Sequence, residues 1–423
     1  MSVTIDFPSP VFVQSAASGH MFQGVANIGA GRMLVHDLKG RVYQSADSGA
    51  TWAQISTVPP QGTGVIFDSQ MFSPALDEAY LFERGSNAGF TEAGWVHRTV
   101  DGGDTWAVVY AHPWAFHGTN FNQAFQWIKV DASTFLLFGQ FTDPALPHTA
   151  ITSNVLKTVD AGASWATTGV LIDPIKLASA GAVLLASGRI VVGMDQPSGA
   201  GRPTVFYSDD GAATWTESGQ FPDVNMDLVT NLITYLCEVA PDVVIALPGP
   251  NMTFDPTLNR TLGVFRSADG AATWAHVPEA DVEDSPIANN NVLSGALLTI
   301  APNVAILGYG YDDHANATWP GFRYTEDAGA TWLKPTVAFD GGTDDPTAYT
   351  ISQWALSDDG LVVVGVESAV GGAGNSSRIW RGVVSGIEPP PPPEPVPAFG
   401  TSPPIDQAIG PEVSLGLVGT FRP

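Results

Sequence analysis

Short runs of alternating apolar and polar residues follow one another along most of the chain, and each run has the length of a β-strand. Alternation of this kind, interrupted by Gly and Asp, predicts half-buried strands joined by tight turns. The first group of runs spans residues 22–28, 32–37, 41–46 and 51–56. The fifth group spans residues 228–239, 243–247, 261–267 and 273–278. The pattern predicts an all-β chain built from successive four-stranded sheets.

An eight-residue segment, here called the octet, ends the third run of six successive groups and leads into the fourth. Its copies are SADSGATW (45–52), TVDGGDTW (99–106), TVDAGASW (158–165), SDDGAATW (208–215), SADGAATW (267–274) and TEDAGATW (325–332). Their starts lie 54, 59, 50, 59 and 58 residues apart, and recurrence at such a spacing is typical of a repeat fold.

The residue types of the octet predict a turn that is held by side-chain hydrogen bonds to the backbone. Ser or Thr at position one and Asp at position three bond nearby backbone N–H groups, and Gly at position five accepts a positive φ. The ring of the final Trp is expected to pack against its own sheet or the next and so to hold the turn against the core. In the octets at 208 and 267, Gly stands at position four and Ala at position five, so either the left-handed residue moves by one or Ala carries strain. The predicted structural residues are Asp47, Trp52, Asp101, Trp106, Asp160, Trp165, Asp210, Trp215, Asp269, Trp274, Asp327 and Trp332.

The octet resembles the Asp-box, or bacterial neuraminidase, repeat S/T-x-D-x-G-x-T-W, and the resemblance extends over roughly residues 20–386. Families that carry this repeat include sialidases, xyloglucanases, sortilin-type receptor domains, a photosystem assembly factor and phage virion proteins. The resemblance implies a β-propeller with the octet at the turn between the third and fourth strands of each blade. It leaves the activity open, because one fold supports many functions.

The remaining strands predict how the ring closes. Residues 349–386 follow the last octet and supply three strands, while residues 2–7 (SVTIDF) form a spare strand at the other end. A closed ring needs its ends joined, since raw strand edges invite association. We therefore expect seven blades in residues 1–387, the seventh completed by the N-terminal strand. A six-bladed ring with a separate C-terminal sheet is the alternative.

Beyond the ring, residues 388–397 (EPPPPPEPVP) form a polyproline linker, and residues 398–423 form a tail too short and too rich in Gly and Pro to fold alone. The tail either folds back on its own propeller or anchors the chain to a neighbouring subunit. Residues 413–421 (VSLGLVGTF) have the pattern of a strand that adds to a partner's sheet edge.

Charge and composition narrow the partners. The formal net charge of −25 argues against nucleic acid, whose phosphates attract basic surfaces. The N-terminus lacks the basic and apolar regions of a signal peptide, and no run approaches about 20 apolar residues, so we expect no membrane insertion. The single cysteine, Cys237, excludes an intrachain disulfide and is expected to be buried. No cofactor motif is found, and we expect no cofactor.

Candidate ligand residues are expected in long loops on the face opposite the octets. Strand alternation places there the connections from the second to the third strand of each sheet and from the fourth strand to the next sheet. Trp114, Tyr309, Tyr311 and Trp319 are candidates for stacking on sugar rings, with Asp312, Asp313 and His314 as polar partners. The alternative is that these aromatic residues fill loop cores. Asp312 and Asp313 with Asp344 and Asp345 are also a candidate Ca²⁺ site, although no calcium-loop motif is present.

Enzymatic alternatives have weaker support. The sialidase resemblance implies an Arg-Ile-Pro motif and convergent arginines, but that motif is absent and only Arg84, Arg202 and Arg260 fall on the long-loop face. Arg32 and Arg189 are expected at the octet face, and Arg41, Arg98, Arg266 and Arg323 in the third strand near the octet. A two-carboxylate glycoside hydrolase, pairing Asp284 with Asp312 or Asp344, is the competing hypothesis.

Taken with the resemblance, these features favour a structural or binding propeller on the exterior of a bacteriophage virion: a tail fibre, spike or head-decoration protein. Its expected location is the virion surface, or otherwise the cytoplasm. Its expected partners are other virion or assembly subunits, reached through residues 398–423, and a host surface glycan. The alternative function is a glycoside hydrolase, sialidase-like or endo-acting, that uses loop carboxylates.

Overall fold

The structure is a computed structural model, and it describes residues 4–6, 10–14, 22–61, 63–66, 71–87, 91–115, 126–141, 153–170, 172, 177–195, 204–219, 221–222, 233–248, 264–277, 291–312, 321–333, 348–360, 362–370 and 377–385. The chain divides into two units, Met1–Pro389 and Pro390–Pro423, and the second lies outside the described residues. Regular structure in the described part is entirely β, and no helix there has the length and hydropathy to cross a membrane.

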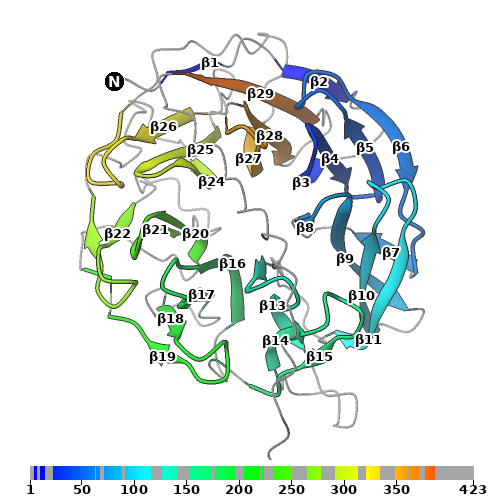
Figure 1. Cartoon of the computed structure of the whole chain (residues 1–423), viewed down its shortest axis with the longest axis horizontal. Coiled ribbons are helices and arrows are strands. Elements are labelled where there is room, and N and C mark those ends of the chain that lie inside the picture. Colours follow the sequence, from blue (N-terminus) through cyan, green and yellow to red (C-terminus); the bar gives the residue numbers. More distant parts are fainter. Residues whose placement is uncertain are drawn as a thin grey trace, which may run out of the picture. The chain divides into compact units, whose positions relative to one another are not determined.

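The first unit is a seven-bladed β-propeller, in which seven antiparallel sheets follow one another around a ring (Figure 1). The strands of each blade are called A to D from the middle of the ring outward. Blade 1 contains β3 (Phe22–Gly29), β4 (Arg32–Asp37), β5 (Arg41–Ser45) and β6 (Ala53–Thr57). In blade 2 the A position is shared by β7 (Thr63–Ile66) and β8 (Phe72–Ala75), followed by β9 (Glu78–Asn87), β10 (Thr91–Thr99) and β11 (Ala107–Ala115).

The next four blades repeat this order. Blade 3 contains β12 (Gln126–Lys129), β13 (Phe135–Phe141), β14 (Ser153–Thr158) and β15 (Ala166–Thr167). Blade 4 contains β16 (Leu177–Leu184), β17 (Ile190–Asp195), β18 (Thr204–Ser208) and β19 (Thr216–Glu217). Blade 5 contains β20 (Ile233–Ala240), β21 (Val243–Pro248), β22 (Phe265–Ser267) and β23 (Ala275–His276). Blade 6 contains β24 (Asn291–Ala301), β25 (Val304–Asp312), β26 (Gly321–Thr325) and a single bridge between Tyr324 and Leu333.

Blade 7 closes the ring with both ends of the propeller. It contains β27 (Ala348–Leu356), β28 (Val362–Val370) and β29 (Ser377–Ser385). Two N-terminal strands, β1 (Thr4–Asp6) and β2 (Pro10–Gln14), pair antiparallel with the outer edge of β29. The predicted seven-bladed ring completed by the N-terminus is confirmed, and the six-bladed alternative is wrong. The second strand, β2, was not predicted.

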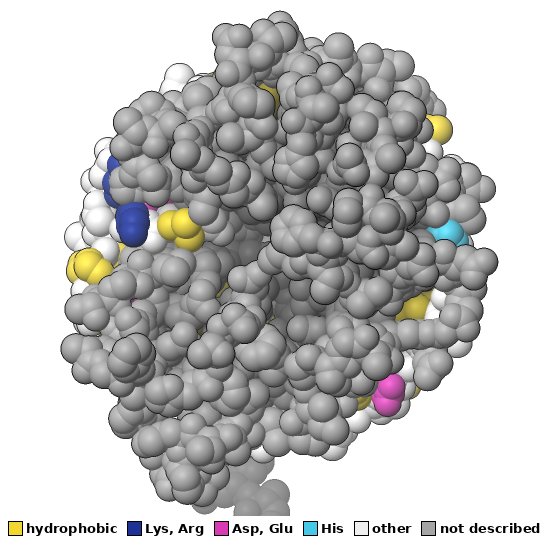
Figure 2. Space-filling view, turned by 180° about the vertical axis from the view of Figure 1, so that it is seen from behind, with side chains coloured by type: hydrophobic (Ala, Val, Ile, Leu, Met, Phe, Trp, Pro, Cys, Tyr) yellow, Lys and Arg dark blue, Asp and Glu magenta, His cyan; other side chains and the backbone are white. Residues whose placement is uncertain are grey.

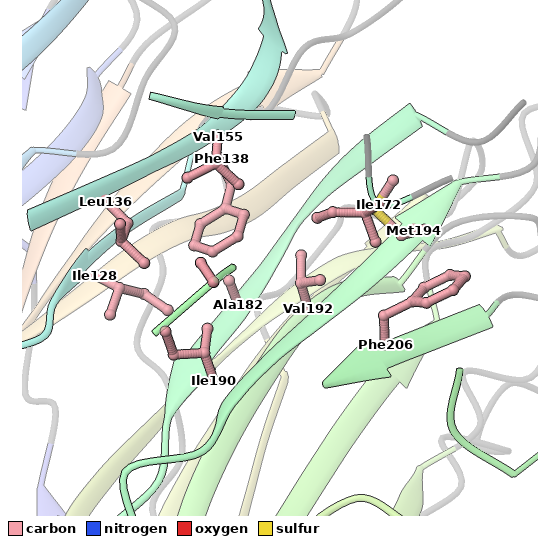
Figure 3. Close-up of a cluster of buried hydrophobic side chains, with 11 residues drawn as sticks. Ile128, Leu136, Phe138, Val155, Ile172, Ala182, Ile190, Val192, Met194 and Phe206 are labelled. Atoms are coloured by element: carbon pink, nitrogen blue, oxygen red, sulfur yellow. The ribbon is translucent and has the colours of Figure 1, made fainter. Parts of the chain in front are cut away.

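Apolar packing between neighbouring blades forms the core, in seven clusters that correspond to the seven joints of the ring. Figure 3 shows the joint between blades 3 and 4, where Leu136 and Phe138 lie opposite Ile190 and Val192. Each octet Trp packs into the joint with the preceding blade. The joint between blades 6 and 7 has no octet, and there Trp354 and Trp380 are buried instead.

The single cysteine is part of this core. Cys237 lies in the joint between blades 5 and 6, where its Sγ is 2.8 Å from the hydroxyl oxygen of Thr299. Burial raises the pKa of the Cys237 thiol to about 11, so the thiol is protonated and unreactive at neutral pH. The predicted buried thiol is confirmed.

Candidate functional site

The six octets share one hydrogen-bonded turn, which lies between strands C and D as predicted. In the first, the Ser45 hydroxyl accepts the N–H of Gly49 at 2.8 Å and donates to Asp47 Oδ1 at 2.7 Å. Asp47 also accepts the N–H of Thr51 at 2.8 Å and the Thr51 hydroxyl at 2.7 Å. The same bonds to the residue at position seven recur at Asp101, Asp160, Asp210, Asp269 and Asp327. Each of these carboxylates is thus hydrogen-bonded within its own turn.

Positions four and five of every octet both have positive φ, so the left-handed residue does not move in the two variant octets. Ala212 and Ala271 adopt φ of 74° and 68° at position five, a conformation that is strained for a residue with a Cβ. Position five also faces the preceding blade: a Cβ added at Gly49 would lie 2.5 Å from Val364 Cγ2. In the variant octets the alanine methyl is buried in the joint cluster.

The hydrogen bonds of the turn stabilise the ionised form of each octet Asp. The hydroxyl of Thr51, Ser164 or Thr214 is the largest influence that lowers the pKa of Asp47, Asp160 and Asp210, each to about 2. The Thr105 hydroxyl likewise lowers the pKa of Asp101. For Asp269 and Asp327 burial acts to raise the pKa, but hydrogen bonds from Thr273 and Thr331 outweigh it and the pKa is lowered.

The backbone of the position-four residue connects the octets to two other segments. Its N–H donates to a carbonyl in the A–B turn of the same blade in five octets, as from Gly102 to Asp77 at 2.9 Å. Its carbonyl accepts a hydrogen bond from a side chain of the preceding blade in all six. These donor and acceptor pairs are Arg381 to Ser48, Gln44 to Gly102, Tyr80 to Ala161, Lys157 to Gly211, Arg189 to Gly270 and Arg266 to Ala328.

The chemistry of this donor varies although the acceptor is constant. In four joints the donor is on strand C. Gln44, Lys157 and Arg266 each directly precede the octet of their own blade, and Arg381 takes the corresponding position in β29 of blade 7, which has no octet. In blade 4 that position holds Tyr207, and Arg189, which directly precedes the neighbouring strand β17, stacks over its ring at 4.1 Å and donates instead. This pattern explains the predicted octet-face position of Arg189. Arg41 was misplaced: it begins β5 at the other end of the strand, where it binds Asp37 at 2.6 Å.

A cavity of about 240 Å³ opens between the inner strands of blades 7, 1, 2 and 3. It is lined by Val25, Ala26, Asn27, Met71, Phe72, Ser73, Gln126, Trp127, Gln353, Trp354, Ala355 and Leu356. Figure 1 shows β3, β8 and β27 around the middle of the ring. Sequence reasoning missed this set, since it joins inner-strand residues from both ends of the chain.

Side-chain amides hold the cavity wall together. The Gln353 Oε1 accepts the N–H groups of Val25 and Met71 at 2.9 and 3.3 Å, and its Nε2 donates to the Met71 carbonyl at 3.2 Å. Asn27 Nδ2 donates to the Leu356 carbonyl at 2.9 Å. These bonds link blades 7, 1 and 2 and satisfy peptide groups that an inner edge strand leaves unpaired. A detectable signal for them was the Ser-Asp-Asp-Gly run at 357–360, whose Asp358 accepts the N–H of Gly31 at 2.9 Å.

The predicted glycan residues lie away from this cavity. The prediction that they lie in loops is wrong for four of them, because the strands are longer than expected. Trp114 belongs to β11, the outermost strand of blade 2, and Tyr309, Tyr311 and Asp312 belong to β25 in blade 6. Blades 7 and 1 separate these two strands on one side of the ring. Asp313, His314 and Trp319 lie outside the described residues, as do Asp284 and Asp344 of the competing carboxylate pair. The view in Figure 2 is covered mostly by residues outside the described set, and the described charged side chains seen there are scattered.

The predicted Ca²⁺ site can be compared with the structure only in part. The described part of the chain contains no group of three or more His, Cys, Asp or Glu residues placed to hold a metal ion. Of the four residues in the predicted Ca²⁺ site, Asp313, Asp344 and Asp345 lie outside the described residues, and the backbone of Asp312 pairs with Asn291 at the end of β25.

Comparison with known proteins supports the fold class. A structure of YCF48 bound to D1 peptide superposes with a TM-score of 0.53 at 13% identity, covering 89% of this chain and 97% of that one. YCF48 from Cyanidioschyzon merolae gives 0.52 at 10% identity, with 89% and 98% coverage. An ulvan lyase of polysaccharide lyase family PL25 gives 0.52 at 12% identity, with 89% and 93% coverage. No family model and no curated protein sequence matches the chain. At these identities the similarity defines a β-propeller and nothing finer.

The octet carboxylates are expected to stabilise the blade, and one octet supplies a matched pair to test this. Asp101→Ala removes the acceptor of the Thr105 N–H and hydroxyl and should lower the free energy of unfolding by about 1 kcal/mol, as for other capping carboxylates. Asp104→Ala, at an exposed position of the same octet, should leave it unchanged. Urea unfolding followed by tryptophan fluorescence measures both, and equal midpoints for the two variants would refute the structural role.

The free energy of unfolding should also depend on pH within a defined acidic range. Because the folded pKa values of Asp47, Asp160 and Asp210 lie at about 2, below the ordinary 3.8, their contribution is complete above about pH 4 and is lost as the pH falls through about 2. Urea midpoints measured from about pH 5 to about pH 2 should fall. The fall should be smaller in Asp47→Asn, and an identical pH profile in this variant would contradict the assignment.

Proposed function

We propose that the protein is a non-catalytic binding propeller: a rigid ring that presents ligand-binding loops on one face and serves as a structural part of a larger assembly. The observation that carries this proposal is the use of the repeated polar residues. All six octet carboxylates are committed to their own turns, and the position-four carbonyls to donors of the preceding blade. The most conspicuous repeated chemistry of the chain therefore supports rigidity.

The assembly is proposed to be a bacteriophage virion, with the propeller on its exterior as a tail fibre, spike or head-decoration protein. The support is the octet sequence, which resembles a repeat found in phage virion proteins among others, and the linker and tail of residues 388–423. In this proposal residues 398–423 tether the chain to other virion or assembly subunits. The net charge of −25 is consistent with protein and glycan partners in preference to nucleic acid.

The ligand is proposed to be a host surface glycan held by the long-loop face, with Trp114, Tyr309, Tyr311, Asp312, Asp313, His314 and Trp319 as contact residues. Propellers of this size include both binding proteins and carbohydrate-active enzymes. Stacking of aromatic rings on sugar faces, together with carboxylates that accept hydrogen bonds from sugar hydroxyls and an imidazole that donates or accepts them, is the chemistry that these residue types offer. The predicted contact residues thus favour a carbohydrate over an anionic polymer.

A glycan array tests the ligand. The wild-type protein should bind a subset of surface glycans, and Trp114→Ala should weaken that binding at least tenfold by removing a stacking platform. Val108→Ala is the matched control, because Val108 is 39% exposed on the same strand, β11. Retention of full affinity in Trp114→Ala would refute this site. Release of new reducing ends from any bound glycan would overturn the non-catalytic role in favour of a glycoside hydrolase.

Deletion of residues 398–423 tests the tether. The truncated chain should keep the glycan affinity and the unfolding midpoint of the full chain but should no longer be incorporated into particles of the assembly. Gradient sedimentation of assembled particles, followed by detection of the propeller, measures incorporation. Normal incorporation of the truncated chain would contradict the proposed anchor.

A further inference from the structure

The cavity in the middle of the ring lies close to the octet face. Its lining residues on β3, β8, β12 and β27 all come within five residues of the A–B turn that follows each strand, and the A–B turns bond directly to the octets. The long-loop connections leave from the opposite ends of the same blades. This site is therefore distinct from the contact residues of the proposed function, which include Trp114 on β11 and Tyr309 and Tyr311 on β25.

Some polar groups of the cavity are used in hydrogen bonds between blades, and others have acceptor atoms left for a ligand. Gln353 and Asn27 are used to join blades 7, 1 and 2. Gln126 donates its Nε2 to the Trp127 carbonyl at 3.3 Å, and its carboxamide oxygen accepts no hydrogen bond from the residues that the structure describes. Ser73 donates to the Ala75 carbonyl at 3.3 Å, which leaves lone pairs on its oxygen. Both side chains are half-buried, and both offer acceptors to a ligand with hydroxyl donors.

The remaining walls are apolar and rigid. Phe72 and Trp127 stack with parallel rings, their centroids 5.5 Å apart and their planes at 2°. Trp127 is buried, and Val25, Met71 and Leu356 complete the wall. The Lys129 ammonium, which follows this wall on β12, is bound to the Pro74 carbonyl at 2.6 Å and so joins blade 3 to blade 2.

We propose that this cavity binds one uncharged sugar residue, as a second glycan site on the octet face. The twelve lining residues carry apolar, amide and hydroxyl side chains, so a charged ligand would find no ionic partner among them. The volume of about 240 Å³ is below that of sites for drug-sized molecules and suits a single ring. A sugar has hydroxyl donors for Gln126 and Ser73 and C–H faces for the aromatic and aliphatic wall.

Saturation-transfer NMR with neutral methyl glycosides of glucose, galactose, mannose and N-acetylglucosamine tests the site on the full chain. At least one glycoside should receive saturation, whereas the charged methyl glycoside of sialic acid should not bind at this cavity. Gln126→Ala removes the free acceptor and Ser73→Phe fills the cavity, and each should weaken binding at least tenfold. Leu76→Ala is the control, because Leu76 is 64% exposed three residues after Ser73 and does not line the cavity.

The outcomes separate this inference from the proposed function, with which it shares the premise of a glycan ligand. Binding that is lost in Trp114→Ala but unchanged in Gln126→Ala and Ser73→Phe would overturn the cavity site and leave the loop site standing. An absence of saturation with every neutral glycoside would also overturn it. If Ser73→Phe unfolds, as circular dichroism would reveal, Gln126→Ala alone decides, because it removes atoms without adding volume.

Discussion

The structure depends on the backbone of one residue, that at position four of the octet, which recurs six times. In five octets its N–H donates to the A–B turn of its own blade, and in all six its carbonyl accepts a hydrogen bond from a side chain of the preceding blade. Two consecutive residues with positive φ are needed to aim both groups, which explains why the octet has Gly, Ser or Ala at these positions. Local turn chemistry and the geometry of the whole ring are thus set by the same few atoms.

Much of the fold could be predicted from the sequence, because its signals are local. The alternation of residues 22–56 gives the four strands of blade 1 to within two residues, and the octet gives the corner after strand C of every blade but the last. The N-terminal closure followed from counting strands. By contrast, β2 carries only five residues and pairs with a strand 363 or more positions away, from Gln14 to Ser377, so nothing near it in the chain identifies it.

The joints between blades were harder to predict, for a physical reason. The acceptor is a backbone carbonyl, which can accept a hydrogen bond from an amide, a phenol, an ammonium or a guanidinium, so the donors Gln44, Tyr80, Lys157 and Arg189 share no residue type. The cavity has the same origin, because Gln353 and Met71 meet only when the ring has closed. The loop residues named from the sequence rest on side-chain chemistry alone, and the structure adds the positions of Trp114 and Asp312 along their strands.

The pairing of β1 with β29 has a consequence for how the chain folds. Thr4 pairs with Ser385, which lies 381 positions later in the chain, so β1 has no pairing partner until nearly the whole propeller has been synthesised. Closing so long a loop is entropically costly and slow, and contacts of high sequence separation lower folding rates. The earliest strands of the propeller are therefore among the last to take their place in it, and the ring closes only after the strands of blade 7 have been made.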